Sequence, residues 1–190
     1  MLGEVLTATV TPFQADGSVD LDAFRALARY LVDNGSDGLV VTGTTGESPT
    51  LSDKEREELW AAALEEVGDR ATVVAGTGTY STEHSVHLTE RAHALGVDGF
   101  LVVTPYYNKP PPRGTVEHFK TILRYYHGLA KGKPSGWLDS IVRTLIQVAR
   151  YHVEVSADVQ AELKRIASKL PPRSARCVTL PSPRRKTSAH

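Results

Sequence analysis

Cysteine is almost absent from this chain of 190 residues, which carries only Cys177. A single thiol cannot form an intrachain disulfide or a cysteine-based zinc site, and such a composition is typical of a reducing compartment. The apolar runs are short, and none approaches the length of a membrane-spanning helix. The amino terminus lacks the basic stretch and apolar run of a signal peptide. These absences predict a soluble, cytoplasmic protein with no membrane partner.

The formal net charge is zero, but the charges are unevenly distributed along the chain. Residues 1–119 hold 8 basic and 18 acidic side chains, whereas residues 120–190 hold 14 basic and 4 acidic side chains. The first part therefore carries a charge of −10 and the second a charge of +10. A reversal this sharp indicates a boundary between regions of different character near residue 120.

The acidic part alternates short apolar runs with helical patterns, which predicts an α/β fold. Strands are expected at residues 5–10, 38–42, 71–75 and 99–103. The helices between them have clear start signals at Asp20, Ser52 and Ser81, and glycines mark their ends. About four βα units fit a doubly wound sheet or part of a (βα)8 barrel. A complete barrel needs about 250 residues, which exceeds this chain.

The βα pattern stops after His118, and no fifth strand can be recognised. Apolar residues recur at helical spacing in residues 137–149, and a second helix is expected at residues 156–169. From residue 171 onward the sequence has little apolar surface to bury, which predicts disorder. We therefore divide the chain into a barrel-like part (1–120), a helical tail (121–170) and a disordered basic tail (171–190).

Two loops that follow expected strands carry most of the hydroxyl groups suited to chemistry. The first is Gly43-Thr44-Thr45-Gly46-Glu47-Ser48, and the second includes Tyr106-Tyr107-Asn108. In parallel α/β folds, functional groups gather at the carboxyl ends of strands. The hydroxyls of Thr44 and Thr45, helped by backbone N–H groups, could bind a carboxylate, or the segment could be a threonine-rich turn without a ligand. Tyr107 could relay a proton or pack at an interface.

Other motifs are weaker. Gly76-Thr77-Gly78 lacks the third glycine of a dinucleotide-binding loop, and residues 43–48 lack the ending of a phosphate-binding loop. His84 and His87 lie one helical turn apart, but a solvated helix face explains them better than a metal pair. The basic tail has no interleaved aromatic residues, so nucleic acid is not the expected partner. The sequence thus predicts no metal and no cofactor.

Four motifs in the first 120 residues occur in an order and at a spacing that are specific to one family. They are Thr9-Val10-Thr11-Pro12-Phe13, Gly43-Thr44-Thr45-Gly46-Glu47-Ser48, Ala75-Gly76-Thr77-Gly78 and Thr104-Pro105-Tyr106-Tyr107-Asn108-Lys109-Pro110. With them, this part of the chain resembles the amino-terminal half of the 4-hydroxy-tetrahydrodipicolinate synthases (dihydrodipicolinate synthases) of the pyruvate-dependent class I aldolase family. Within that family, Thr44-Thr45 together with Tyr106-Tyr107-Asn108 is similar to the synthases rather than to the sialic acid lyases.

The resemblance implies a partial (βα)8 TIM barrel, a homo-oligomer, and a lyase of lysine and diaminopimelate biosynthesis. Members condense pyruvate with aspartate semialdehyde through a Schiff base on a lysine of strand six. By motif match, Thr44 and Tyr107 are catalytic residues of a proton relay, with Tyr107 lent across a dimer interface. Thr45 matches the position that binds the pyruvate carboxylate.

The sequence after residue 120 contains no match to the family's strand-five tyrosine, the following arginine or the strand-six lysine. The sequence therefore leaves two hypotheses about function. The chain is a lyase by resemblance, or it is a truncated or frameshifted half-barrel that acts at most as a binding or assembly module.

Overall fold

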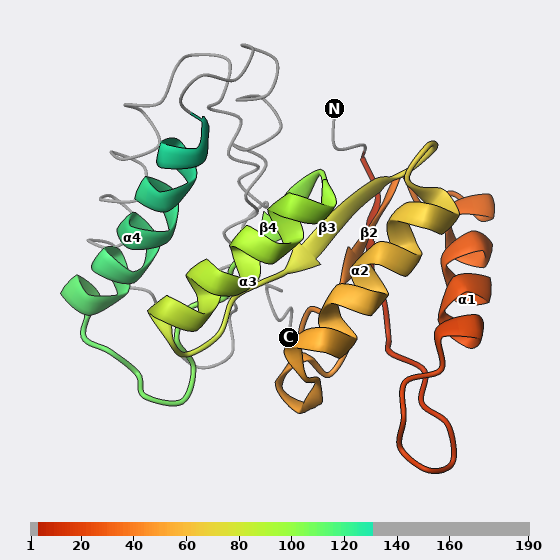
Figure 1. Ribbon diagram of the computed structural model, residues 1–190, viewed down its shortest axis with the longest axis horizontal. Helices are drawn as coiled ribbons and strands as arrows, with labels where there is room; N and C mark the ends of the chain where they lie inside the picture. Colours follow the sequence, from red (N-terminus) through yellow and green to blue (C-terminus); the bar gives the residue numbers. More distant parts are fainter. Residues whose placement is uncertain (1–3, 131–190) are drawn as a thin grey trace, which may run out of the picture.

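The computed structural model describes residues 4–130, which form one four-stranded sheet and the helices around it (Figure 1). The predicted helices at residues 137–149 and 156–169, and the predicted disorder from residue 171, lie outside the described residues. All strand pairs are parallel, and the order β1-β2-β3-β4 follows the chain. The elements are β1 (Leu6–Ala8), α1 (Leu21–Asp33), β2 (Gly38–Val41), η1 (Ser48–Thr50), α2 (Asp53–Val67), β3 (Thr72–Gly76), α3 (Thr82–Leu95), β4 (Gly99–Leu101) and α4 (Pro112–Ala130).

The predicted start signals set the helix boundaries. The Asp20 side chain accepts a hydrogen bond from the Ala23 N–H, and Ser52 and Glu55 form a reciprocal capping box at the start of α2. Ser81 caps α3 through the His84 N–H, and Gly96 ends that helix in the left-handed conformation. These interactions span three or four residues, which is why the sequence alone could predict them.

The core lies between the sheet and the helices α1, α2 and α3. Alternate strand residues, such as Leu39 and Val73, are fully buried in register on this face. Trp60 of α2 and Phe24 of α1 are also fully buried against it. The opposite face of the sheet carries the register row Ala8, Val40, Val74 and Gly99. This arrangement of sequential parallel strands corresponds to half of a (βα)8 barrel.

Two features differ from the sequence prediction. The long helix α4 was not predicted, although Val116, Phe119 and Ile122 are buried at helical spacing along it. The run of prolines at residues 110–112 concealed its start, because proline fits the first turn of a helix as well as a loop. The spacing of Leu88, Ala92 and Leu95 in the sequence favours one buried stripe on α3, but Leu95 is 40% exposed at the end of the helix.

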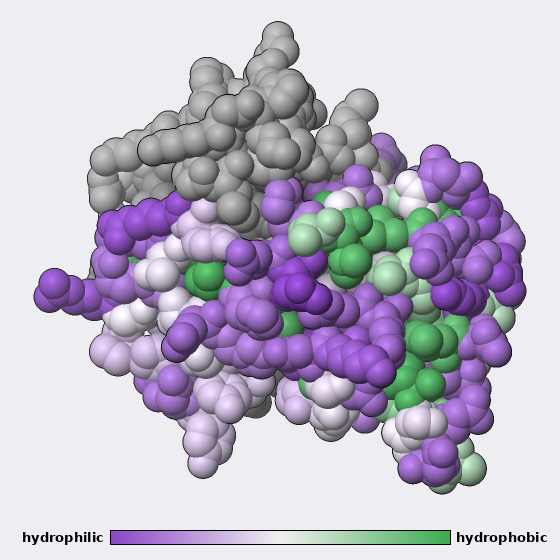
Figure 2. Space-filling view, in the orientation of Figure 1, coloured by the Kyte–Doolittle hydropathy of each residue, from purple (hydrophilic) through white to green (hydrophobic). Residues whose placement is uncertain are grey.

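Rows of ion pairs connect the outer surfaces of the helices. Arg25 contacts Glu65 at 2.8 Å between α1 and α2, and Arg91 contacts Glu57 at 2.6 Å between α3 and α2. Figure 2 shows a surface that is largely hydrophilic, with apolar patches between the charged side chains. Exposed pairs of this kind contribute little to stability individually. No described helix is both long enough and apolar enough to cross a membrane.

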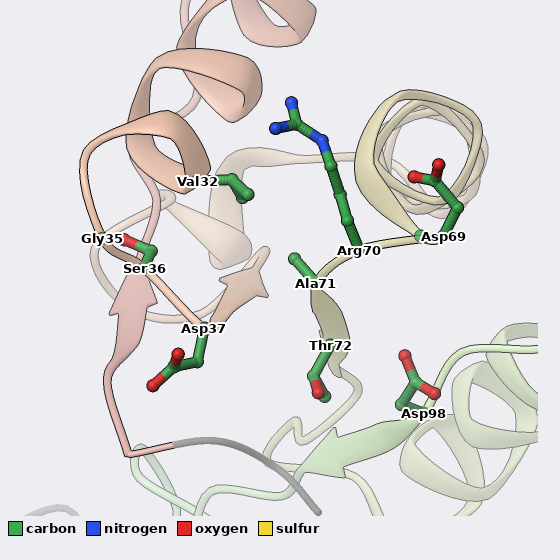
Figure 3. A pocket seen from close by; sticks show the side chains of 10 residues that line it. Val32, Gly35, Ser36, Asp37, Asp69, Arg70, Ala71, Thr72 and Asp98 are labelled. Atoms are coloured by element: carbon green, nitrogen blue, oxygen red, sulfur yellow. The ribbon is translucent and has the colours of Figure 1, made fainter.

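A polar hollow of about 630 Å³ lies at the amino ends of the strands (Figure 3). Two of its three carboxylates, those of Asp37 and Asp98, accept hydrogen bonds from the backbone. Asp37 accepts hydrogen bonds from the N–H groups of Glu4 and Val5 at 2.7 and 2.8 Å, which lower the pKa of its carboxyl group. Asp98 accepts from the Val73 N–H at 2.9 Å. In each case the aspartate directly before a strand (β2 or β4) accepts hydrogen bonds from the backbone of the neighbouring segment, which is the start of the chain before β1 for Asp37 and β3 for Asp98.

We expect the Asp98→Ala variant to lose about 1–3 kcal/mol of unfolding free energy. The reason is that the buried Val73 N–H then has no acceptor. Asp98→Asn is the matched control, because its amide oxygen can still accept this hydrogen bond. Urea unfolding of both variants checks the prediction. Equal loss in the two variants would show that the carboxylate charge, and not the hydrogen bond, stabilises the sheet.

Candidate functional site

The two loops singled out in the sequence lie at the same edge of the sheet. Residues 43–48 follow β2 and residues 102–111 follow β4, and all four strands run parallel. The carboxyl ends of parallel strands share one edge, so Thr44 and Thr45 lie at the edge where barrel enzymes place their active sites. Tyr107 belongs to the same edge through the β4 loop.

The loop of residues 43–48 presents its two threonines to solvent. It folds on itself through hydrogen bonds from the N–H groups of Gly46 and Ser48 to the Gly43 carbonyl, at 3.1 and 3.3 Å. Thr44 and Thr45 are exposed, and within residues 4–130 their N–H groups donate to no protein acceptor. Two hydroxyls and two N–H groups are thus available to a ligand. Such a set of donors suits a carboxylate.

The segment after β1 supports this loop from one side. The Thr11 hydroxyl donates to the Gly46 carbonyl at 2.7 Å, and Thr11 is 6% exposed. A Cβ added at Gly46 would lie 3.1 Å from the Thr9 carbonyl oxygen and 3.2 Å from the Thr11 hydroxyl. The close approach fixes the position of the loop relative to β1. A side chain at residue 46 would push the two segments apart.

The β3 loop is held by buried hydroxyl groups of α3. The Thr89 hydroxyl lies 2.8 Å from that of Thr77, and the Ser85 hydroxyl accepts from the Thr79 N–H at 2.9 Å. All four residues are at most 3% exposed. The N–H groups of Thr77 and Gly78 donate to the Leu101 carbonyl. These hydrogen bonds connect the β3 loop to α3 and to β4 and hold it in place beside the candidate site.

The β4 loop carries exposed aromatic side chains. Tyr107 is 85% exposed. The preceding residue, Tyr106, packs edge-on against Tyr80, with the two ring centroids 5.9 Å apart. Burial raises the pKa of Tyr106, while the nearby Arg56 charge opposes that shift. Within residues 4–130, no hydrogen bond or ring contact joins Tyr107 to Thr44. Thr44 and Thr45 thus lie exposed in one loop, and Tyr107 lies exposed in another loop at the same edge of the sheet.

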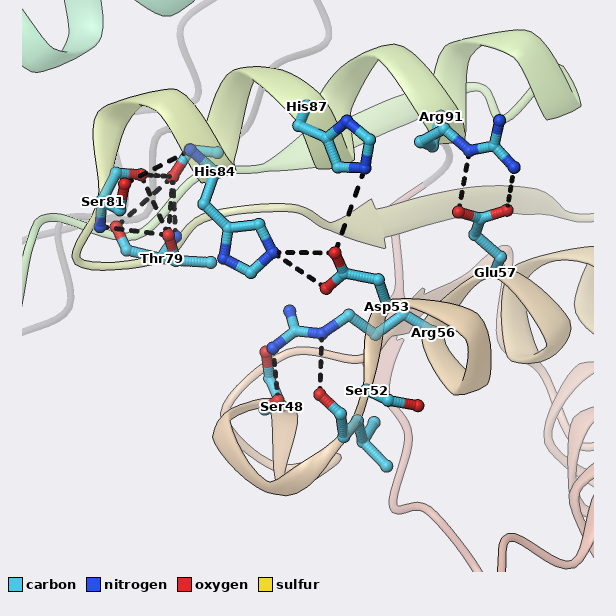
Figure 4. A network of polar contacts seen from close by, with 12 residues as sticks. Ser48, Ser52, Asp53, Arg56, Glu57, Thr79, Ser81, His84, His87 and Arg91 are labelled. Atoms are coloured by element: carbon cyan, nitrogen blue, oxygen red, sulfur yellow. Dashed lines mark hydrogen bonds and ion pairs between the residues drawn. The ribbon is translucent and has the colours of Figure 1, made fainter.

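The role of Arg56, whose side chain extends from α2 toward the 43–48 loop (Figure 4), was not predicted from the sequence. Arg56 is 4% exposed and donates to the carbonyls of Ser48 and Leu51. Burial lowers the pKa of its guanidinium group, and the Asp53 charge opposes the shift. An arginine in the first turn of a helix normally lies in solvent, so only the packing around it reveals this function.

Two of the three histidines of α3, His84 and His87, face the acidic start of α2. His84 Nε2 lies 2.8 Å from the Asp53 carboxylate, and His87 Nε2 lies 4.0 Å from it (Figure 4). This contact gives His84 a polar partner on the helix surface, where the sequence had predicted a solvated face. Among residues 4–130, no group of three or more histidine, cysteine, aspartate or glutamate side chains is arranged to hold a metal ion.

Comparison with protein families decides what this half-barrel is. Residues 1–130 match the model of the dihydrodipicolinate synthetase family. The chain belongs to this family. The 4-hydroxy-tetrahydrodipicolinate synthase of Acidothermus cellulolyticus is 60% identical over 120 residues, which are 63% of this chain and 39% of the relative. That of Mycolicibacterium paratuberculosis is 61% identical over 121 residues, with 64% and 40% covered.

Solved dihydrodipicolinate synthases share the fold. The Bacillus anthracis enzyme superposes with a TM-score of 0.69 at 36% identity, covering 87% of this chain and 53% of its own. The Acinetobacter baumannii enzyme, solved in complex with pyruvate, has a TM-score of 0.64 at 37% identity, with 66% and 43% covered. The recognised resemblance and the partial barrel fold are thereby confirmed. The chain spans about 40% of the length of the curated family members it matches.

Proposed function

We propose that this chain binds pyruvate through the 43–48 loop, as the amino-terminal half of a 4-hydroxy-tetrahydrodipicolinate synthase. The observation that carries the proposal is the pair of exposed threonines with free backbone N–H groups at the carboxyl end of β2. The pyruvate complex of a relative supports the choice of ligand. In this role Thr45 binds the carboxylate and Thr44 belongs to the proton relay.

Tyr107 takes the second hydroxyl position of the relay from a neighbouring subunit. Its exposed fraction of 85% and the lack of a recorded contact to Thr44 within the described residues support a role outside its own subunit. Condensation with aspartate semialdehyde then depends on association, and the working form is a homo-oligomer. Proton transfer between two hydroxyls requires distances near 2.7 Å, so in this role Tyr107 approaches the Thr44 hydroxyl of the neighbouring subunit this closely.

Schiff-base formation requires a lysine whose amine is neutral, which burial in apolar surroundings favours. The lysines of the described residues are Lys54, Lys109 and Lys120. The Lys54 side chain is 84% exposed beside Glu58, Lys109 lies in an exposed turn, and Lys120 lies 2.9 Å from Glu117. None projects from a strand. None of these three lysines is placed for a Schiff base, and the sequence has no match to the strand-six lysine motif, so we infer that the chain alone binds pyruvate without forming the covalent adduct.

We expect the double replacement Thr44→Val and Thr45→Val to weaken pyruvate binding about 10- to 100-fold. This corresponds to the loss of about 1.5–3 kcal/mol from hydrogen bonds to a charged ligand. Titration calorimetry or saturation-transfer NMR with pyruvate measures the change. Thr121→Val on α4, whose hydroxyl donates only to the Glu117 carbonyl, is the matched control. Methyl pyruvate lacks the carboxylate and should not bind.

The covalent step is tested in the same samples. Pyruvate is added, the mixture is reduced with borohydride, and the intact protein is weighed. We expect an unchanged mass for the wild-type chain. A pyruvate adduct on one lysine would overturn the inference that the nucleophile is missing, while pyruvate binding that survives the double replacement would overturn the assignment of the loop.

An assembly module without catalysis is the second candidate. It is favoured by the exposed Tyr107 and by the fact that, within the described residues, β1 and β4 are each paired along one edge only. Unpaired parallel edges are surfaces on which another chain can add strands. A folded chain that binds no pyruvate would support this alternative.

A further inference from the structure

Trp60 connects the interior of α2 to the start of the 43–48 loop. Its side chain is fully buried, and its indole Nε1–H donates a hydrogen bond of 2.8 Å to the Thr42 hydroxyl. Thr42 is the last residue before the loop and is 1% exposed. A buried indole N–H needs an acceptor, because leaving it unpaired costs the desolvation of that group. The hydrogen bond therefore fixes both partners.

Thr42 has a backbone conformation that is unfavourable for a threonine. Its φ angle is +56°, in the left-handed region that disfavours β-branched residues. Its hydroxyl, which accepts from Trp60, donates to the Gly76 carbonyl of β3 at 3.2 Å. Residues in such conformations persist where the surroundings hold them, and they cluster at functional sites. Here the holding contacts come from α2 and from β3.

Arg56 holds the other end of the same loop. Its guanidinium donates to the Ser48 carbonyl through Nη2 and to the Leu51 carbonyl through Nε. Arg56 and Trp60 are four residues apart, so they lie on one face of α2. This face points toward the loop (Figure 4 shows the Arg56 half of the arrangement). Helix α2 thus contacts Thr42, which precedes the loop, and Ser48, which ends it.

We propose that Trp60 and Arg56 are positioning residues that clamp the two ends of the 43–48 loop and thereby fix Thr44 and Thr45 for carboxylate binding. The clamp explains how a loop with glycines at residues 43 and 46 presents two exposed threonines in one conformation. The part that concerns the ligand rests on the proposed function. The part that concerns loop rigidity stands on the hydrogen bonds alone.

The deciding variant is Thr42→Val, which keeps the shape and the branching of the side chain and removes its hydroxyl. We expect the hydrogen-bonded amides of Gly46, Glu47 and Ser48 to exchange about tenfold faster or more, with exchange in the core of α1 almost unchanged. Pyruvate affinity should fall by a similar factor. Thr42→Ser restores the hydroxyl and should return both quantities to within about threefold of the wild type.

A Trp60→Phe variant tests the same contact from the other partner, since it removes the N–H and retains an aromatic ring. Combined with Thr42→Val, it should add little to the exchange rate of the loop, because Thr42→Val has already removed the acceptor of the Trp60 Nε1–H. If Thr42→Val does not fold, the comparison of Trp60→Phe with Thr42→Ser gives the same answer. Faster exchange throughout β2 and β3, without selectivity for residues 43–48, would overturn the clamp.

The two proposals fail in distinguishable ways. A wild-type chain that binds no pyruvate, with a Thr42→Val loop that exchanges faster, would contradict the ligand and keep the clamp. Pyruvate binding that is unaffected by Thr42→Val, with loop exchange also unaffected, would keep the ligand and contradict the clamp. Faster loop exchange with unchanged pyruvate affinity would show that the clamp does not position Thr44 and Thr45.

Discussion

Replacing Gly76 with alanine is expected to destabilise the chain by about 4 kcal/mol or more, which is the range of the most damaging single substitutions. A Cβ at this position would lie 2.1 Å from the Thr42 carbonyl oxygen and 2.6 Å from the Thr42 carbonyl carbon. Both atoms are backbone, and Thr42 is already held in a left-handed conformation by Trp60. The backbone has no easy way to move aside. β2 and β3 would therefore separate where the candidate site is built.

Gly43→Ala is the matched control for this experiment. Gly43 lies one residue after Thr42, but a Cβ there would meet the Leu101 side chain at 3.4 Å, which is ordinary contact. We expect Gly43→Ala to change the unfolding free energy by less than about 1 kcal/mol. Chemical unfolding of both variants, followed by circular dichroism, checks the difference. Similar stabilities of the two variants would contradict the close approach of β2 and β3.

The second large effect concerns pH and His118. This residue of α4 is 3% exposed, its Nδ1 lies 2.8 Å from the Thr82 hydroxyl, and its buried Nε2 has no partner within the described residues. Burial lowers its pKa from 6.5 to about 4. Above pH 6.5 the imidazole is neutral in both the folded and the unfolded chain. As the pH falls below 6.5 the unfolded chain binds a proton that the folded chain does not.

The stability of the wild type should therefore decrease as the pH falls from 6.5 toward 4. Allowing for partial solvent screening, we expect a loss of about 1–2 kcal/mol between pH 7 and pH 5 that is attributable to this group. His118→Gln cannot be protonated in this range and should lack that slope. Carboxyl groups with lowered pKa values, such as Asp37, act at lower pH in both proteins and cancel in the comparison. Parallel pH profiles for the two proteins would contradict a buried neutral His118.

The sequence predicted those parts of the fold that local signals encode. The caps at Asp20, Ser52 and Ser81 are residues whose side chains bind backbone groups three positions away, so the pattern is visible in a short window. The strands were also recognised from short apolar runs, although their predicted ends were one or two residues too long in several places. The helix α4 was missed because prolines at its start resemble a loop.

The candidate site was predicted in part. The position of Thr44 and Thr45 at the end of a parallel strand followed from the sequence, and the fold confirms it. Their roles, and that of Tyr107, remain predictions. The supporting residues were not found, because a buried Arg56 and a buried Trp60 look like an ordinary charged residue and an ordinary core residue within α2. Nothing in a helix pattern shows that Trp60 contacts the residue before the 43–48 loop and that Arg56 contacts the last residue of the loop.

What the sequence alone determined is the order of strands and helices and the exposed hydroxyl loop between β2 and α2, since these depend on neighbouring residues. The tertiary structure decided how that loop is held. The indole of Trp60 reaches Thr42 across 18 positions, and Thr42 reaches Gly76 across 34. Contacts at such separations form only when the parallel sheet brings the ends of β2 and β3 together beneath α2, so no local pattern encodes the left-handed turn at Thr42.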